Sequence, residues 1–474
     1  MSTSSPQEPL HVDSDVPSRL DALGWSRWHK RVVVALGITW ILDGLEASLI
    51  SAMGATLQDA RTLGLSATEV GITNTVYLAG QVLGALVFGH LTDRHGRKRL
   101  FLITLALYLV STALSGLAPN LVVFAMFRFF AGAGIGGEYA AINSAIDELV
   151  PARLRGQIDL GINGSYWVGA AMAFGLSLIV LDPDIIPIEY GWRIAFGLGS
   201  ILGLAILLIR RHVPESPRWL LLHGRHDEAR EVVAIIEEAA GGLPKDITIA
   251  AVRVRVRRRQ GIGPLIHTLF VRYPRRAILG VVLMLSQAFL YNAIFFSYAL
   301  VLEKFHGVRA QDVGLYGLPF AAANFLGPLL LGRMFDRVGR RSMISATYAL
   351  SGVLLAITGA LFAYGFLDAV TQTLCWSVVF FFASAAASSA YLTVSELFPL
   401  ELRGMAIAVF YAFGTGIGAF APTLFGMFVE SGNPMSVFHG YLLATVLMLV
   451  AAIVARTHGV DAERRSLEEL CPHD

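Results

Sequence analysis

Four charged side chains interrupt stretches of sequence that are otherwise apolar: Asp43, Glu46, Arg128 and Glu138. A charge in the middle of a bilayer costs about 3 kcal/mol or more, so such residues usually serve proton or substrate pathways. A carboxylate beside an arginine is favoured in its charged form, whereas removal from water favours its neutral form. We therefore expect Asp43, Glu46, Arg128 and Glu138 to form a proton-coupling set, in which an acid exchanges its arginine partner for a proton. Glu138 serves coupling, a gate or packing. The alternative is a structural ion pair that never titrates.

The elements that must position these charges are membrane-spanning helices. Of the 474 residues, 55% are hydrophobic and 15% are charged, whereas soluble domains carry about 25% charged residues. A bilayer core of ~30 Å takes about 20 apolar residues per helical span, and lipid leaves open backbone without hydrogen-bond partners. We predict an all-α membrane protein whose twelve spans form two six-helix bundles. The predicted spans are 32–55, 69–91, 99–117, 121–146, 157–181, 192–211, 274–302, 312–335, 343–365, 369–395, 404–429 and 435–456.

The basic residues of the loops predict the orientation of the chain. The loops on the side of the termini hold eleven Arg and Lys residues and the opposite loops hold four, which places both termini in the cytoplasm. The first 30 residues lack the apolar core of a cleaved signal peptide. The predicted parts are a cytoplasmic tail (1–30), a first bundle (31–211), a cytoplasmic linker (212–273), a second bundle (274–457) and a cytoplasmic tail (458–474). The linker should form a short helix from Pro217 to about Ala240.

Two motifs occur twice, in the same order. Residues 89–98 are GHLTDRHGRK and residues 332–341 are GRMFDRVGRR, with an offset of 336 − 93 = 243. Residues 148–156 are ELVPARLRG and residues 396–404 are ELFPLELRG, with an offset of 396 − 148 = 248. Parallel repeats about an axis along the membrane normal characterise the halves of major facilitator transporters. The duplication therefore indicates two related halves.

The repeated loops resemble the signature loop of the major facilitator superfamily. The second motif pair, together with PESPRWL at 214–220, is similar to the sugar porter and metabolite–proton symporter branches. The resemblance implies a charge network that holds a cytoplasmic gate shut; the alternative is a tight turn with topology charges. The gate residues are Gly89, Asp93, Arg94, Gly96, Arg97, Glu148, Arg155, Asp336, Arg337, Arg340, Glu396 and Arg403.

The same resemblance assigns candidate residues for coupling and for a central pocket. DGLEASLIS at 43–51 resembles the first span of aromatic-acid symporters and sugar porters, where Glu46 falls on the proton-accepting acid and Arg128 on the arginine of span 4. The resemblance implies that Glu46 carries the proton, that Arg128 is its partner, and that Asp43 is a second carrier or a substrate contact. Glycines 132, 134, 136 and 137 predict close helix packing, with a coupling role as the alternative. The expected substrate-binding residues are Trp40, Asn163, Trp167, Gln287, Tyr291, Asn292, Phe295 and Tyr391. This pocket keeps fewer amides than a hexose pocket, which favours a smaller, partly apolar metabolite.

These features predict a secondary active transporter that couples proton movement to symport of a small polar metabolite, either an organic or aromatic acid or a sugar-like molecule. A drug–proton antiporter of the same fold is the alternative, and a transporter-like sensor ranks last. No nucleophile triad, metal cluster or Walker A motif is visible, so we expect no enzyme, no metal and no cofactor, with the proton gradient as the energy source. We expect a monomer in the cell's inner or plasma membrane, in contact with lipid and not with nucleic acid.

Overall fold

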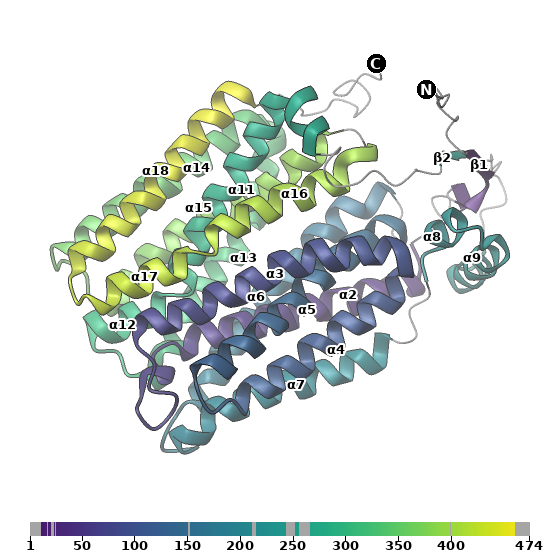
Figure 1. Cartoon of the computed structure of the whole chain (residues 1–474). Helices are drawn as coiled ribbons and strands as arrows, with labels where there is room; N and C mark the ends of the chain where they lie inside the picture. The colour runs from purple at the N-terminus through teal and green to yellow at the C-terminus, as the bar shows by residue number, and fades with distance from the viewer. Residues whose placement is uncertain are drawn as a thin grey trace, which may run out of the picture.

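The protein is described by a computed structural model that covers its helical body. The described residues are 11–16, 18–19, 23, 25–149, 152–210, 215–242, 252–255, 266–398 and 400–459. Long helices run side by side through the molecule, and a small group of short elements sits at one end of them (Figure 1). The predicted all-helical membrane fold is confirmed, because ten stretches of the described residues are long and apolar enough to cross a membrane.

The first set of long helices matches the first six predicted spans. It comprises α2 (Arg27–Met53), α3 (Ala67–His95), α4 (Arg97–Gly116), α5 (Leu121–Leu149), α6 (Ala152–Val180) and α7 (Ile188–Arg210). A short 3-10 turn, η1 (Thr56–Gln58), lies between α2 and α3. Ser66 caps α3 by accepting a hydrogen bond from the Glu69 amide while Glu69 returns one to the Ser66 amide, so the start of this helix is fixed locally.

The second set of helices covers the other six predicted spans, two of which are broken. It comprises α11 (Pro274–Phe295), α12 (Tyr298–His306), α13 (Val313–Arg337), α14 (Arg340–Ala363), α15 (Ala369–Leu397), α16 (Leu400–Gly418), α17 (Ala421–Glu430) and α18 (Pro434–His458). Short turns η2 (Thr268–Arg272) and η3 (Ala310–Asp312) precede α11 and α13. The predicted span 274–302 breaks at Phe296 and Ser297, and the span 404–429 breaks at Ala419 and Phe420.

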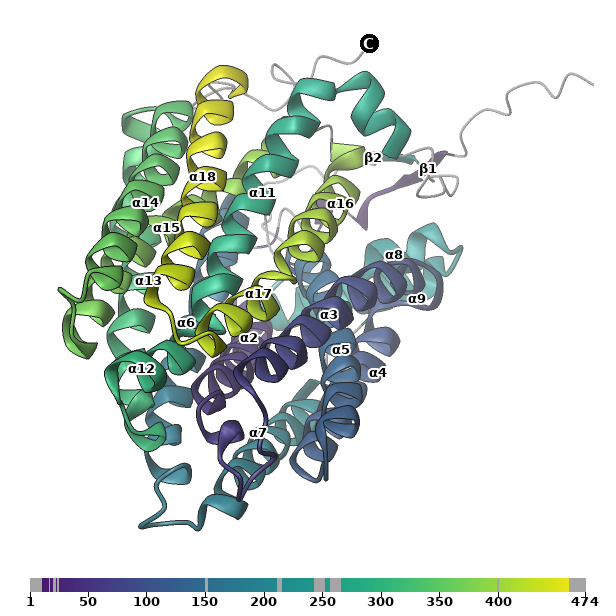
Figure 2. The same ribbon diagram turned by 60° about the vertical axis from the view of Figure 1, so that its left-hand side comes forward.

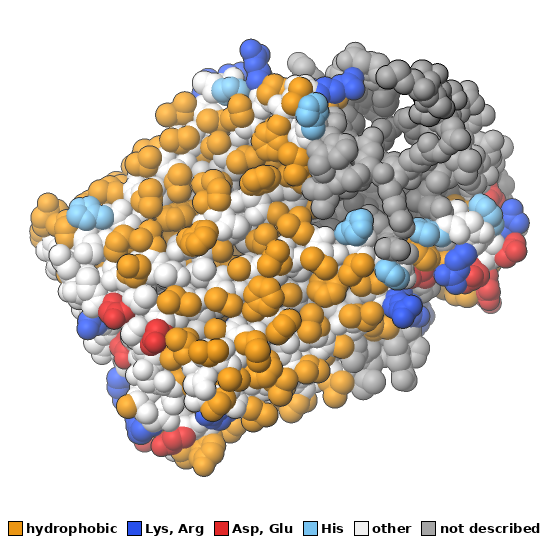
Figure 3. Space-filling model, viewed as in Figure 1, with side chains coloured by type: hydrophobic (Ala, Val, Ile, Leu, Met, Phe, Trp, Pro, Cys, Tyr) orange, Lys and Arg blue, Asp and Glu red, His pale blue; other side chains and the backbone are white. Residues whose placement is uncertain are grey.

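The outer face of the bundle is apolar. Leu, Val, Ile and Phe side chains are exposed along the long helices, for example Leu83 on α3, Leu326 on α13 and Val446 on α18. Figure 3 shows hydrophobic side chains across the middle of one face and charged side chains gathered at its ends. A face of this kind suits a surrounding of lipid rather than water.

Glycines on α3 and α5 allow these two helices to touch backbone to backbone. A Cβ atom built on Gly132 would lie 2.0 Å from the Tyr77 carbonyl oxygen, and one on Gly80 would lie 2.1 Å from that of Phe129. Gly134 faces Thr104 and Tyr108 on α4 in the same way. The predicted close packing of the α5 glycines is therefore confirmed, and it fixes the helix that carries Arg128.

The two sets of helices meet most closely at the end of the bundle opposite α8 and α9, here called the far end (Figures 1 and 2). There α17 lies against α3, where a Cβ on Gly71 would come 2.3 Å from the Pro422 carbonyl oxygen and one on Gly426 would come 2.4 Å from that of Ala67. Thr75 Oγ1 also donates to the Ala419 carbonyl at 2.6 Å. The structure is thus tightly closed at the far end.

The opposite end, here called the linker end, carries α8 (Pro217–Leu222), α9 (His226–Ala240) and a two-stranded sheet. Strands β1 (His11–Ser14) and β2 (Val252–Arg255) pair antiparallel, with Val12 opposite Val254. The predicted single linker helix is divided at Gly224, whose φ of 75° ends α8. The strand pair was not predicted, because its two segments lie about 240 residues apart and the alternating Val and Arg residues at 252–257 were interpreted only as topology charges.

Candidate functional site

An ion pair between α2 and α5 lies at the centre of the first set of helices. Glu46 Oε1 accepts from Arg128 Nη1 at 2.7 Å, and the two side chains are 2% and 0% exposed. Thr112 on α4 donates to the same oxygen at 3.0 Å, and Tyr108 of α4 lies beside the carboxylate. The predicted contact between Glu46 and Arg128 is therefore present, while its role in coupling stays a prediction.

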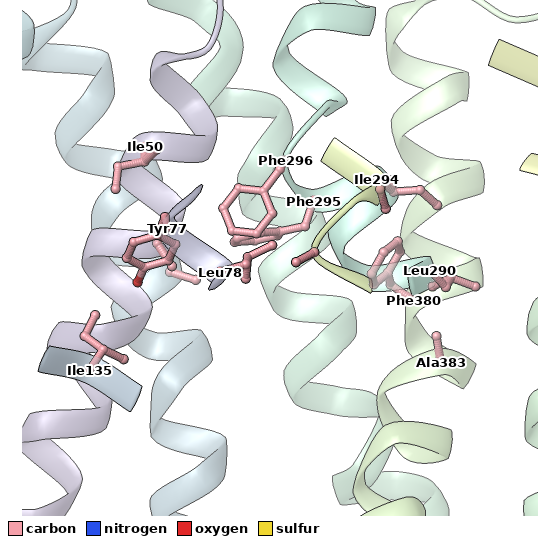
Figure 4. Close-up of a cluster of buried hydrophobic side chains, with 14 of the residues drawn as sticks. Ile50, Tyr77, Leu78, Ile135, Leu290, Ile294, Phe295, Phe296, Phe380 and Ala383 are labelled. Carbon is pink, nitrogen blue, oxygen red and sulfur yellow. The ribbon is translucent and has the colours of Figure 1, made fainter. Parts of the chain in front are cut away.

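The guanidinium of Arg128 also lies on the face of an aromatic ring. Its central carbon is 4.0 Å from the centre of the Tyr77 ring on α3, a cation–π contact worth about 2 kcal/mol in a dry site. Figure 4 shows Tyr77 among the buried side chains Ile50, Leu78 and Ile135. Because the pair is dry, removing either partner leaves an uncompensated buried charge, which is far more costly than the loss of one surface ion pair.

The pair is not fully saturated with hydrogen bonds. Within the described residues, the Nε and Nη2 atoms of Arg128 have no hydrogen-bond partner, whereas the Glu46 carboxylate also interacts with the Tyr108 hydroxyl. A closed structural ion pair gains most when every donor and acceptor is used. The spare donors of Arg128 fit a pair that exchanges contacts.

The other two predicted coupling acids are also buried. Asp43 is 3% exposed on α2, and its charge acts on Tyr166 of α6 and on Tyr411 of α16. Asp43 therefore lies where the first and second sets of helices face each other. Glu138 is fully buried on α5 beyond the glycine stretch. Their roles stay predictions.

Glycines set the position of α2 as well. A Cβ on Gly44 would lie 1.9 Å from the Tyr166 carbonyl oxygen, and one on Gly169 would lie 1.8 Å from that of Ile41. The α2 and α6 backbones therefore touch at the level of Asp43 and Glu46. This contact leaves little freedom for the two carboxylates to move by sliding of the helix.

Three of the predicted substrate-binding residues come together across the two sets of helices. The ring of Trp167 on α6 lies 6.3 Å from that of Tyr291 and 6.2 Å from that of Phe295, both on α11. Trp167 also contacts Phe320 on α13, and Phe320 packs 4.2 Å from Phe380 on α15. The result is an aromatic cluster that contains no charged group.

The other predicted lining residues surround this cluster less directly. Trp40 contacts Tyr166, which contacts Trp167. Gln287 and Asn292 lie on α11 and are half-buried, as is Tyr391 on α15. The side chain of Asn163 lies outside the described residues.

The structure adds members that sequence reasoning missed, namely Phe320, Asn324 and Phe380. Asn324 is 0% exposed on α13, and its side chain accepts a hydrogen bond of 2.8 Å from the Tyr291 hydroxyl. A single amide inside the otherwise apolar predicted span, four residues before Pro328, was the available signal. Figure 4 shows Phe380 beside Leu290, and Phe295 and Phe296 between them and Leu78 of α3.

The repeated loops adopt matching backbone conformations at the linker end. Gly96 between α3 and α4 has a φ of 94°, and Gly339 between α13 and α14 has a φ of 104°. A side chain at Gly96 would also meet Glu215, whose Oε2 lies 2.5 Å from an ideal Cβ. Glu215 accepts from the amide of Lys98 at 3.2 Å, so this acid of the PESPRWL segment occupies the N-terminus of α4.

The remaining gate predictions are placed only in part. Gly89 lies within α3, Arg337 is exposed at the end of α13, and Arg340 begins α14 half-buried. The other predicted gate side chains lie outside the described residues: Asp93, Arg94, Arg97, Glu148, Arg155, Asp336, Glu396 and Arg403. Within the described part of the chain, no three His, Cys, Asp or Glu side chains are grouped to hold a metal ion.

Comparison with known proteins agrees with this architecture. The profile of the "sugar (and other) transporter" family matches residues 38–470. The niacin transporter NiaP of Acinetobacter baylyi is 28% identical over 458 residues, which covers 96% of this chain and 99% of the relative. The putative metabolite transport protein YdjK of Escherichia coli is 29% identical over 482 residues, covering 96% of each chain.

Solved structures share the fold. The crystal structure of a D-xylose–proton symporter superimposes with a TM-score of 0.72 at 20% identity, covering 93% of this chain and 100% of the other. The inward-open xylose transporter XylE of E. coli gives a TM-score of 0.70, covering 94% and 98%.

Proposed function

Because the chain belongs to the sugar (and other) transporter family of the major facilitator superfamily, we propose that it imports a small organic or aromatic acid by proton-coupled symport. The chain is a multi-pass membrane transporter and not an enzyme, because the family model and the named relatives are those of transporters. The direction, the coupling ion and the substrate class are our proposal.

The observation that carries the proposal is the dry Glu46–Arg128 pair. When Glu46 is charged, the pair is neutral overall, and the guanidinium of Arg128 on α5 is held by the carboxylate of Glu46 on α2. When Glu46 takes a proton, the attraction is lost and Arg128 keeps a full charge in a dry site. That charge then favours an anionic group nearby, so protonation of Glu46 and binding of a carboxylate support each other.

The aromatic cluster supports the substrate class. Trp167, Tyr291, Phe295 and Phe320 bring aromatic rings together from both sets of helices, an environment that suits a flat apolar ring better than a polyhydroxylated sugar. Two relatives carry niacin in their names, and niacin is a small aromatic acid. A sugar would require more hydrogen-bonding groups than this cluster provides.

The tight contacts at the far end support a proposal of alternating access. Among the described residues, five hydrogen bonds join the two sets of helices there: Thr75 with Ala419 and with Thr423, Thr68 with Glu430, Gln58 with Glu303, and Ser51 with Phe295. We propose that these bonds break when the far end opens and that the loops with Gly96 and Gly339 then close the linker end. Under the predicted orientation, closure of the far end supports the proposal that this is the cytoplasm-facing state.

The test is uptake into proteoliposomes of labelled nicotinate, benzoate, succinate and xylose, with and without an inward proton gradient. We expect the gradient to drive accumulation of an aromatic acid above its outside concentration. Accumulation of xylose alone would show that the substrate is a sugar and not an aromatic acid. Equal uptake of an aromatic acid with and without the proton gradient would contradict proton coupling. A protonophore, which dissipates the gradient, is the control.

A further inference from the structure

A proline in α13 leaves one backbone carbonyl without its helical partner. The carbonyl of Asn324 would normally accept from the amide of residue 328, but Pro328 has no N–H. Ser384 of α15 donates to this carbonyl instead, at 2.7 Å. The proton of the Ser384 hydroxyl is thereby committed.

The side chain of Asn324 is fixed in one orientation. Its Nδ2 donates to the Phe320 carbonyl at 2.9 Å, and a carbonyl can only accept. The opposite atom, Oδ1, therefore faces the Tyr291 hydroxyl, at 2.8 Å. An amide oxygen can only accept, so Tyr291 must donate its single proton to Asn324.

The Tyr291 oxygen consequently has only lone pairs left to offer. Ser384 also lies beside this hydroxyl, but its proton is used by the Asn324 carbonyl, so Ser384 cannot reverse the direction. The ring of Tyr291 is half-buried, faces Trp167 across the two sets of helices and packs 4.9 Å from Phe380. Tyr291 is thus the polar tip of the aromatic cluster.

We propose that Asn324 is a positioning residue that makes Tyr291 a hydrogen-bond acceptor only, so that the transporter selects substrates with a donor on the ring. The inference rests on the proposed function and sharpens its substrate class to aromatic acids that carry a hydroxyl, an amine or a ring N–H. A ligand with an acceptor at that position leaves the Tyr291 oxygen buried without a partner and is disfavoured.

The experiment compares matched competitors for uptake into proteoliposomes: 3- and 4-hydroxybenzoate against 3- and 4-fluorobenzoate. Fluorine is smaller than a hydroxyl and carries no proton, so size alone does not exclude it. In the parent protein we expect one of the hydroxy acids to inhibit roughly tenfold better than its fluoro analogue. Tyr291→Phe should reduce that ratio to about one, because no acceptor remains.

Variants of Asn324 show whether this residue orients the Tyr291 hydroxyl or serves only to stabilise the fold. Asn324→Leu combined with Ser384→Ala removes both oxygens that can accept the Tyr291 proton, so the tyrosine can donate to the ligand as well and the ratio should fall. Asn324→Asp in its neutral form can donate to Phe320 and still accept from Tyr291, so the parent ratio should be kept. A merely structural role would lower the uptake rate in both variants without changing the ratio.

A ligand-free measurement tests the hydrogen bond independently. Thermal unfolding midpoints of Tyr291→Phe, Asn324→Leu and the double variant should be non-additive, since both single changes remove the same bond. Additive shifts of the unfolding midpoints would overturn the inference and leave the proposed function intact. The same holds if the hydroxy acids and their fluoro analogues inhibit the parent protein equally. Failure of every aromatic acid to be transported would instead overturn the proposed substrate class.

Discussion

Single residues carry the coupling in this account. Glu46 and Arg128 lie 82 residues apart and meet in a dry environment, with Thr112 and Tyr77 as their neighbours. Their pairing could be predicted because Glu46 in DGLEASLIS and Arg128 match the acid and the span 4 arginine of the family that the sequence resembles. The partners of Asn324 could not be predicted, since a polar amide in a span has many potential contacts and only the packing of α11, α13 and α15 selects one.

Removing one partner of the buried pair should be costly, and removing both should be tolerated. Arg128→Met leaves a buried carboxylate alone and should lower the free energy of unfolding by about 3–5 kcal/mol. The double variant Arg128→Met with Glu46→Leu should recover most of this loss, because no charge remains buried. Unfolding of the purified protein in detergent measures both effects, and a single variant as stable as the double one would show that the pair is not dry.

Helices and their contacts were predictable to different degrees. The positions of the spans followed from apolar runs of about 20 residues, and the glycine stretch on α5 indicated close packing. The breaks in α11 and α16 were not predicted, because the chain around Phe296 and Ala419 is as apolar as the rest of each span. What fixes the break in α11 is tertiary contact with α2.

The contact between α3 and α5 gives a prediction for a glycine. Gly132→Ala places a methyl group against the Tyr77 carbonyl and should destabilise the protein by about 1–3 kcal/mol, since the two backbones must separate. Gly175→Ala on α6 is the matched control, because no atom lies within 4 Å of its added methyl group. The thermal unfolding midpoint measures both variants, and equal midpoints would contradict the packing argument.

Ser51 on α2 gives a prediction for the break in α11. Its hydroxyl donates to the Phe295 carbonyl, the last of α11, which has lost its helical partner. Ser51→Ala leaves this carbonyl unpaired only when the far end is closed, so it should shift the population toward the state open at that end, by about 1–3 kcal/mol.

Ser48→Ala is the control for Ser51, since Ser48 is equally buried on the same helix and makes no hydrogen bond to the described residues. Distances between spin labels placed at the far ends of α3 and α17 report the population of the open state. The same distance distribution in both variants would exclude a gating role for Ser51.

At the scale of the whole molecule, the two-fold repeat was the feature that the sequence made clearest. Both copies of the first motif have a glycine with positive φ at the same place, Gly96 and Gly339. The association of the N-terminal segment with the linker was invisible, because it depends on a strand pair and on an ion pair between distant segments. Arg19 binds Glu237 of α9 at 2.6 Å, and this hydrogen bond raises the pKa of Arg19.

The N-terminal segment should therefore stay docked on the linker through charge complementarity. In a variant without native cysteines, Val12→Cys and Val254→Cys should form a disulfide rapidly, since the two residues are opposite each other in the strand pair. Arg19→Glu should slow this cross-link by repulsion from Glu237, and the swap Arg19→Glu with Glu237→Arg should restore it. An unchanged rate in the single variant would show that the ion pair does not hold the segment.

The central claim is that the Glu46 carboxylate carries the proton that moves with the substrate. The most direct measurement is the change in external pH when a transported aromatic acid is added to lightly buffered proteoliposomes. The parent protein should make the medium alkaline in proportion to uptake, and Glu46→Gln should move the acid down its gradient without any pH change. An undiminished pH change in the Glu46→Gln variant would contradict the claim.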